Sequence, residues 1–325
     1  MAVLFYLTVG AWTPCPRNVM AFELPDFDTL WDYDHPDTTE ARFRAILPDA
    51  RRAGDLAYLA QLLTQIARAE GLQMKFDEAG RTLDEAESVL SQPWSDGRVR
   101  NFPDTRVRVL LERGRLLNST NRREESKPVF RAAWESTKVL CPDVYKVDVA
   151  HMLGIVESGD SSIYWNRTAI GIAERSADPK ARRWLGSLYN NLGWTYHEKG
   201  EFETALDLFR KALGARESEG KKGEIRVARW CVARALRSLG RLEEALAAQR
   251  ALLDENMADN APDGFVEEEI GECLLGLGRS AEAAPHFAAA YMLLSADPWL
   301  QRDEPERLER LRRLGGSPEP APKKP

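Results

Sequence analysis

Apolar side chains recur at intervals of three and four residues through most of this chain, which is the spacing of one face of an α-helix. The stretch SLYNNLGWTYHEKGEFETALDLFRKAL, residues 187–213, shows the pattern twice. Tyr189, Leu192 and Tyr196 precede Gly200, and Ala205 and Phe209 follow it. The stretch therefore predicts two helices joined near Gly200, because glycine readily adopts the left-handed conformation that ends many helices.

The same spacing occurs in six places along the chain. Aligning them on the small residue of the first helix gives six anchor positions, which are Ala67, Gly114, Gly154, Gly193, Ala233 and Gly271. The intervals between the anchors run from 38 to 47 residues. In the third copy, Asn166 and Ile170 stand at the places that Ala205 and Phe209 occupy in the fourth. A near-constant period of this length predicts an array of stacked helix pairs and not a single globular core.

The packing of two helices explains the residue types at these positions. We expect Gly193 and Ala205 to let the two helices of a pair approach closely. We expect Tyr196 and Phe209 to fill the space between the pair and its neighbours. One pair cannot bury its apolar face alone, so the copies must stack on one another.

The segments that flank the array give a division into five parts. Residues 1–37 form a largely irregular lead, 38–59 an N-terminal helix region and 60–297 the repeat array. Residues 298–314 are expected to be a capping helix, because Leu308, Leu311 and Leu314 recur every three residues on a polar background. Residues 315–325 carry four prolines and two glycines and are predicted to be a disordered tail.

Composition and charge narrow the class of protein. The net charge is −6, which argues against general nucleic-acid binding. The four cysteines are scattered without a CxxC spacing, which is typical of reduced thiols in the cytoplasm. The first twelve residues are apolar but too few to span a membrane. They read as an over-extended start or a disordered lead, with a divergent signal peptide as the alternative.

The repeat resembles the tetratricopeptide repeat (TPR). Residues 187–213 match its signature most closely, and the matching residues are Tyr189, Leu192, Gly193, Tyr196, Ala205, Phe209 and Ala212. Tyr189 replaces the usual tryptophan, and the period near 40 exceeds the usual 34, as in kinesin light chains and the bacterial Rap regulators. The resemblance implies an all-α, right-handed α-α superhelix of about six helix pairs with additional N- and C-terminal helices. It also implies binding of peptides or proteins on the inner face of the superhelix.

The first helices of such an array line the inner face, so equivalent positions in each copy give candidate binding residues. The candidates are Arg68, Arg115, Asn118, His151, Asn190, Trp194, His197, Trp230, Arg234 and Arg237. A mixture of guanidinium, aromatic and amide groups suits an acidic segment or a free C-terminal carboxylate with one apolar anchor. The alternative is ordinary surface or packing between repeats, and for Trp230 a place in the core.

The segment FELPDFDTLWDYDHPDTTE, residues 22–40, alternates acids with aromatic residues. Because its charge is opposite to that of the arginine-bearing face, one hypothesis is that it lies against the array as an internal pseudo-ligand. The other is that Phe27, Trp31 and Tyr33 anchor the chain to the first helices.

No catalytic constellation accompanies the repeat. The four histidines are far apart in sequence, and the chain has no HExxH, GxSxG, P-loop or GxGxxG motif. We therefore expect no catalytic, cofactor-binding or metal-binding residues. The predicted function is a non-enzymatic, cytoplasmic scaffold or adaptor that binds a protein or peptide. The alternative is a ligand-responsive sensor of the Rap-like type that binds a small peptide or metabolite.

Overall fold

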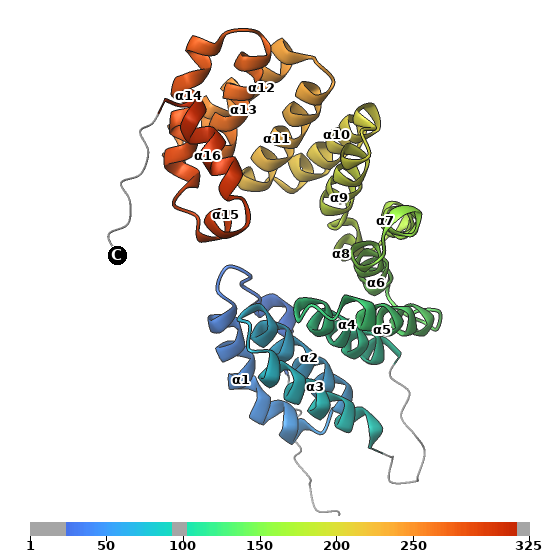
Figure 1. Cartoon of the computed structure of the whole chain (residues 1–325). Helices are drawn as coiled ribbons and strands as arrows, with labels where there is room; N and C mark the ends of the chain where they lie inside the picture. The colour runs from blue at the N-terminus through green and yellow to red at the C-terminus, as the bar shows by residue number, and fades with distance from the viewer. Residues whose placement is uncertain (1–23, 93–102, 317–325) are drawn as a thin grey trace, which may run out of the picture. The chain divides into compact units, whose positions relative to one another are not determined.

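The computed structural model describes residues 24–92 and 103–316, and these residues form two compact units. The first unit belongs to residues 1–101 and the second to residues 102–325, and each is described separately. All regular elements in the described ranges are helices, as the sequence predicts (Figure 1). The predicted irregular lead falls outside the described residues up to position 23, and most of the predicted tail, from position 317, does too.

The first unit consists of a short 3-10 helix and three α-helices. These are η1 (Phe27–Leu30), α1 (Pro36–Ala53), α2 (Leu56–Leu72) and α3 (Phe76–Ser91). Helix α1 ends at Gly54, whose φ of 72° a residue with a side chain rarely adopts. One residue later, the Asp55 carboxylate accepts a hydrogen bond from the backbone N–H of Tyr58 and caps α2. The chain therefore reverses direction between α1 and α2 within two residues.

The aromatic residues before α1 anchor the lead to the first unit. The Phe27 ring is buried and lies edge-on to Phe43 of α1 and to Tyr58 of α2, at centroid distances of 6.4 and 5.1 Å. The Trp31 indole N–H donates to Gln65 of α2 over 2.9 Å. These contacts support the hypothesis that the aromatic residues of this segment anchor the chain to the first helices.

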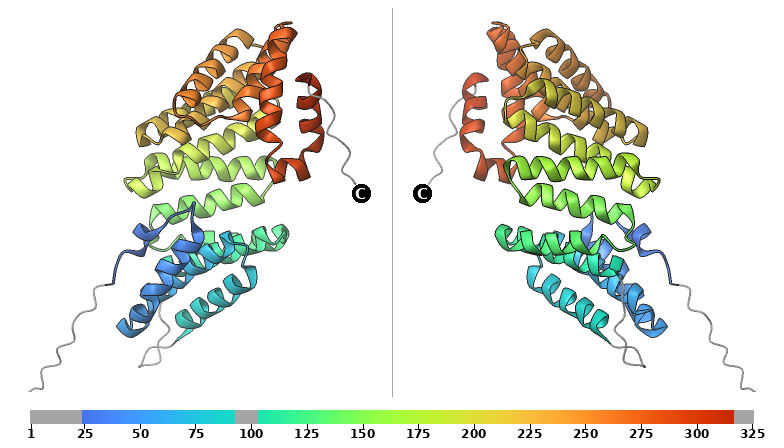
Figure 2. Two further views of the ribbon diagram at one scale, coloured as in Figure 1. Left: turned by 90° about the vertical axis from the view of Figure 1, so that its left-hand side faces the viewer. Right: turned by 90° about the vertical axis from the view of Figure 1, so that its right-hand side faces the viewer.

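The second unit contains five antiparallel helix pairs and a C-terminal extension. The pairs are α4 (Pro103–Ser119) with α5 (Arg123–Ser136), α6 (Asp143–Val156) with α7 (Gly159–Arg175), α9 (Leu185–Glu198) with α10 (Phe202–Glu219), α11 (Lys222–Ser238) with α12 (Leu242–Ala258), and α13 (Gly264–Gly276) with α14 (Ser280–Leu294). A four-residue helix, α8 (Pro179–Arg182), lies between α7 and α9 in the chain. In Figure 2 successive helices of this unit lie in layers, one on the next. With α2 and α3 of the first unit, these pairs confirm the six predicted copies.

The predicted close approach within a pair is confirmed at three anchors. A Cβ atom built on Gly193 would lie 2.6 Å from the Phe209 ring. The same construction brings a Cβ on Gly114 against the Phe130 ring, and it gives 2.8 Å between Gly271 and Phe287. Phe209 therefore fills the space above Gly193 inside its own pair, not only the space between pairs.

The third copy departs from the predicted register. A Cβ on Gly154 would meet the Asn166 side chain at 2.8 Å, so Asn166 takes the place that the phenylalanine ring has elsewhere, and Ile170 does not. The link from α6 to α7 is two residues long, whereas three residues join α9 to α10. Asn166 is 4% exposed, and its amide donates to the Ser162 carbonyl over 3.0 Å.

The C-terminal segment forms two helices and not the single predicted one. They are α15 (Pro298–Asp303) and α16 (Pro305–Leu314). Pro305 begins the second helix, which is the position where the missing proline N–H costs no intrahelical bond. Leu308 and Leu311 of α16 are buried, and α16 packs against α14. Across the described ranges, no helix is both long and apolar enough to span a membrane.

Candidate functional site

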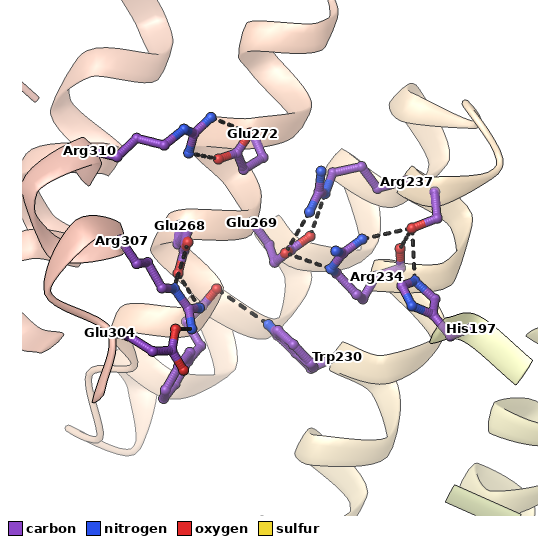
Figure 3. A network of polar contacts seen from close by, with 12 residues as sticks. His197, Trp230, Arg234, Arg237, Glu268, Glu269, Glu272, Glu304, Arg307 and Arg310 are labelled. Atoms are coloured by element: carbon purple, nitrogen blue, oxygen red, sulfur yellow. Dashed lines mark hydrogen bonds and ion pairs between the residues drawn. The ribbon is translucent and has the colours of Figure 1, made fainter. Parts of the chain in front are cut away.

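Five of the predicted site residues lie together on α9 and α11, the first helices of two successive pairs. They are Trp194 and His197 of α9 and Trp230, Arg234 and Arg237 of α11, and Figure 3 shows all of these but Trp194 by label. Helices α9 and α11 are in direct contact. The His197 Nε2 atom of α9 lies 2.9 Å from the Ser238 hydroxyl of α11. The Cys231 thiol donates to the Asn190 side-chain carbonyl over 3.2 Å.

Aromatic rings form a continuous row across these helices, which we call the aromatic row. The ring centroids of Trp194 and Trp230 are 6.0 Å apart, and those of Trp230 and Phe265 of α13 are 6.5 Å apart. The Trp230 indole N–H donates to the Phe265 carbonyl over 3.3 Å and fixes the ring between α11 and α13. Phe265 is 37% exposed, and both tryptophans are half-buried. Trp230 is therefore part of a partly exposed face and not of the closed core.

Phe265 was not among the residues predicted from the sequence, although its position carried a signal. Phe265 lies three residues before Glu268, which is one helical turn along the predicted face. Its backbone N–H is capped by the Asp263 carboxylate at the start of α13. A search one turn earlier along each first helix would have found it.

Arg234 and Arg237 form the second feature of the face, which we call the guanidinium pair. Both contact the buried carboxylate of Glu269 on α13 (Figure 3). Arg237 binds it through Nε at 2.7 Å and Nη2 at 3.0 Å, and Arg234 Nε lies 3.2 Å from it. Arg234 Nη1 donates to Ser238 over 2.7 Å. Two positive charges thus share one carboxylate.

Burial and charge perturb this group of side chains. Burial lowers the pKa of Arg234 although Glu269 opposes the effect, and Arg237 adds repulsion. Burial would also lower the pKa of Arg237, but its paired hydrogen bonds to Glu269 raise it overall. Burial, followed by the two guanidinium charges, lowers the pKa of His197. A further negative charge placed here would stabilise all three protonated forms.

The face continues to α16 through two more arginine–glutamate contacts. Arg307 binds Glu268 over 2.6 Å and Glu304 over 2.8 Å, and its guanidinium lies 5.2 Å from the Phe265 ring centroid. Arg310 binds Glu272 through two contacts, one of them 3.1 Å long. From the sequence this segment was expected only to cap the array, so the position of Arg307 at the Phe265 end of the aromatic row was not predicted.

Arg115 lies apart from this group and is engaged elsewhere. Its guanidinium binds Glu112 over 2.5 Å and also binds Asp148 of α6. Burial alone would lower the pKa of Arg115, but Asp148 and Glu112 raise it above its usual value. Arg115 therefore joins α4 to α6, which is the packing alternative considered for the predicted face.

The remaining predicted residues are spread over other helices. Asn118 is half-buried one turn beyond Arg115. The His151 ring lies 5.2 Å from the Trp184 ring. Arg68 belongs to the first unit, where its guanidinium lies 6.0 Å from the Tyr33 ring centroid. Asn118 and His151 therefore lie outside the group on α9, α11 and α13, and Arg68 belongs to the other compact unit.

Comparison with known proteins agrees with this geometry. Residues 185–218, which contain α9 and most of α10, match the family model for the tetratricopeptide repeat. The protein contains a tetratricopeptide repeat. No sequence among the curated proteins matches this TPR chain significantly.

Solved structures show the same fold over more of the TPR chain. The apo form of RapI has a TM-score of 0.67 and 10% identity, over 89% of this chain and 78% of that one. A signal transduction ATPase with a tetratricopeptide repeat sensor from Pyrococcus horikoshii has a TM-score of 0.59 and 14% identity, over 92% and 49%. The TPR-like repeats of a kinesin light chain from Podosopora anserina have a TM-score of 0.50 and 14% identity, over 63% and 100%. The fold is thus a TPR-like solenoid, which is generally a non-catalytic scaffold for protein interactions.

Proposed function

We propose that this TPR protein is a non-enzymatic scaffold that binds a protein or peptide segment on the face formed by α9, α11 and α13. The observation that carries the proposal is the aromatic row lying beside the guanidinium pair. Aromatic residues and arginine are the side chains that contribute most to binding energy in protein interfaces. The cytoplasm is the proposed location of the protein, and the three buried free cysteines of the described residues support it.

The guanidinium pair supports recognition of a carboxylate on the partner. Glu269 neutralises only one of the two positive charges. In the described part of the chain, Nη2 of Arg234 and Nη1 of Arg237 have no hydrogen-bond acceptor. A ligand carboxylate that accepts from these two atoms would balance the remaining charge. An acidic side chain and a C-terminal carboxylate both supply this group.

The aromatic row supports an apolar anchor next to that carboxylate. Trp194, Trp230 and Phe265 retain exposed ring surface although they pack against one another. Val227, one turn before Trp230 on α11, is 60% exposed and extends the apolar surface. Covering an exposed aliphatic or aromatic side chain here would remove apolar area from water at roughly 25 cal/mol per Å².

The test compares two tryptophan variants of the full chain. Trp230→Ala removes the centre of the aromatic row, whereas Trp299→Ala removes a tryptophan of α15 that is 53% exposed. We expect affinity capture to recover partners with the wild type and Trp299→Ala and to lose them with Trp230→Ala. Synthetic peptides from those partners, with free and amidated C-termini, then identify the carboxylate by calorimetry. Equal recovery with both variants would contradict the proposal.

A ligand-responsive sensor is the second candidate function. The supporting observation is the series of ion pairs that joins α11 to α13 and α13 to α16, since a ligand carboxylate can compete with Glu269 for the guanidinium pair. The sensor function predicts a change in the radius of gyration by solution scattering when the identified peptide is added. An unchanged radius at saturating peptide would leave the scaffold function alone.

A further inference from the structure

A second hollow surface lies on the other side of α9, away from the aromatic row. One hollow of about 610 Å³ lies between α8, α9 and α10, and another of about 480 Å³ lies between α7, α9 and α10. Both are lined by Tyr189 and Lys211, so the two hollows adjoin at these side chains, and we call them together the outer groove. Volumes of this size are those of ligand-binding clefts.

The connection between the third and fourth copies accounts for the outer groove. Nine residues, 176–184, join α7 to α9, whereas two residues join α10 to α11. The longer link includes α8, which packs against α6 and α7 and so occupies the junction of the two copies (Figure 1). Small residues on the groove walls, Gly171 of α7 and Ala215 of α10, leave the remaining space open.

One end of the outer groove is positively charged. Arg182, Arg183 and Lys211 line it, and all three are exposed. In the described part of the protein, no carboxylate forms an ion pair with Arg183 or Lys211. The acid on this lining, Glu219, is already 3.3 Å from the Arg216 guanidinium. This end therefore carries uncompensated positive charge.

The hollow beside α7 carries more acids than bases. Glu174, Glu203 and Asp207 line it and are exposed, and Arg167 and Lys211 line it too. Glu203 has no ion-pair partner among the described residues, and Asp207 lies 3.9 Å from Arg210 at the limit of an ion pair. The charged residues of the outer groove thus sum to a positive charge in the hollow beside α8 and to a negative charge in the hollow beside α7.

Tyr196 offers a hydrogen-bond donor in the hollow beside α7, whose lining it shares with Glu203. Tyr196 is 6% exposed, and its hydroxyl oxygen accepts a hydrogen bond from Arg167 over 2.6 Å. Within residues 24–92 and 103–316, no protein group accepts the hydroxyl proton of Tyr196. By contrast, the Tyr189 hydroxyl donates to the Glu174 carboxylate over 2.5 Å. The Tyr196 hydroxyl is therefore available to donate to a carbonyl oxygen of a ligand in the groove.

We propose that the outer groove binds an extended segment of a partner protein that carries an acidic residue at one end and a basic residue at the other. The charges of the segment complement the two ends of the groove, and one of its backbone carbonyls accepts from Tyr196. Residues 203–219 of α10 extend over about 24 Å at 1.5 Å per residue. A segment of about seven residues in an extended conformation has this length. The outer groove is separate from the proposed binding face and does not depend on it.

Selection from a random twelve-residue peptide library displayed on phage tests this proposal with the full chain as bait. We expect enriched peptides to carry one acidic and one basic residue about four to six positions apart. Their synthetic versions should bind the wild type in fluorescence anisotropy. They should lose at least tenfold affinity when Arg183→Glu and Lys211→Glu are combined, and when Glu203→Lys is introduced. Because these side chains are exposed, circular dichroism should show unchanged folding.

Two matched variants complete the test. Arg250→Glu reverses an exposed charge of α12 outside the groove and should leave binding unchanged. Trp230→Ala should also leave it unchanged, which separates the outer groove from the aromatic row. The proposal is overturned if no peptide is enriched, if the enriched peptides lose binding only with Trp230→Ala, or if a peptide with acids at both ends binds as tightly.

Discussion

The contact between Gly193 and Phe209 gives the most direct test of how the helix pairs are held together. A methyl group added by Gly193→Ala would lie 2.6 Å from Cε1 and 2.8 Å from Cδ1 of the ring. Carbon atoms prefer separations of about 3.5–4.0 Å, so the ring must move by about 1 Å. Phe209 is fully buried in the core, and the Trp194 ring lies 5.2 Å from it. The ring therefore has little space to move into.

The energetic cost follows from two opposing effects. Overpacking of this kind typically costs about 1–3 kcal/mol. Alanine is more favourable than glycine inside a helix by about 1 kcal/mol, which partly offsets the clash. Gly214→Ala is the matched control, because Gly214 also lies inside a helix, α10, but has no atom within 4 Å of its notional Cβ. The difference in stability between the two variants therefore isolates the cost of the contact, and we expect about 1–3 kcal/mol.

The measurement is urea unfolding followed by far-ultraviolet circular dichroism. Gly214→Ala should unfold at a higher urea concentration than the wild type, and Gly193→Ala at a lower one. Adding Phe209→Leu to Gly193→Ala should recover part of the loss, because the two substitutions act on one contact and are not additive. If Gly193→Ala stabilises the protein as much as Gly214→Ala does, the two helices are not held at this distance.

Three further predictions concern charge and burial. Glu269→Gln should reduce the free energy of unfolding by about 1–3 kcal/mol, because it leaves two guanidiniums without their buried carboxylate. The control Glu255→Gln breaks an exposed ion pair with Arg229 and should cost less than about 1 kcal/mol. Urea unfolding measures both losses, and equal losses would contradict the buried role of Glu269. Burial raises the pKa of the Cys231 and Cys273 thiols to about 12, so neither should react with a maleimide in the native protein at pH 8, as mass spectrometry of labelled peptides would show. Burial and two neighbouring guanidiniums lower the pKa of His197, so the imidazole binds a proton more readily in the unfolded state than in the folded state. The stability that His197 contributes should therefore be lost as pH falls below about 6.5. The free energy of unfolding of His197→Gln should fall less than that of the wild type between pH 7.5 and pH 5.5, and identical pH profiles of the two proteins would refute the prediction.

The repeat and the small residues at its anchors could be predicted from the order of the amino acids alone. Apolar spacing and small anchors predicted all six helix pairs, because a helix pair has to bury one face against its own partner, and that requirement depends on local sequence. The left-handed turns at Gly200, Gly240 and Gly278 were predictable for the same reason, and their φ values lie between 73° and 77°. The third copy shows where this reasoning stops, since α7 begins five residues after Gly154 whereas α10 begins nine residues after Gly193, and this four-residue difference places Asn166, not Ile170, against Gly154.

Which polar residues meet depends on the arrangement of the helices in space. The sequence offered Arg115 and Arg234 as equivalent positions on one face, but Arg115 is held by Glu112 and Asp148, while Arg234 shares Glu269 with Arg237. Apart from Glu112, which is on the same helix as Arg115, these partners come from neighbouring helices, and such contacts span 32 to 39 residues of the chain. Their meeting depends on the rotation and spacing of whole helix pairs. The outer groove is a further case, because it depends on how α8 separates two copies, a geometry that periodicity along the chain does not encode.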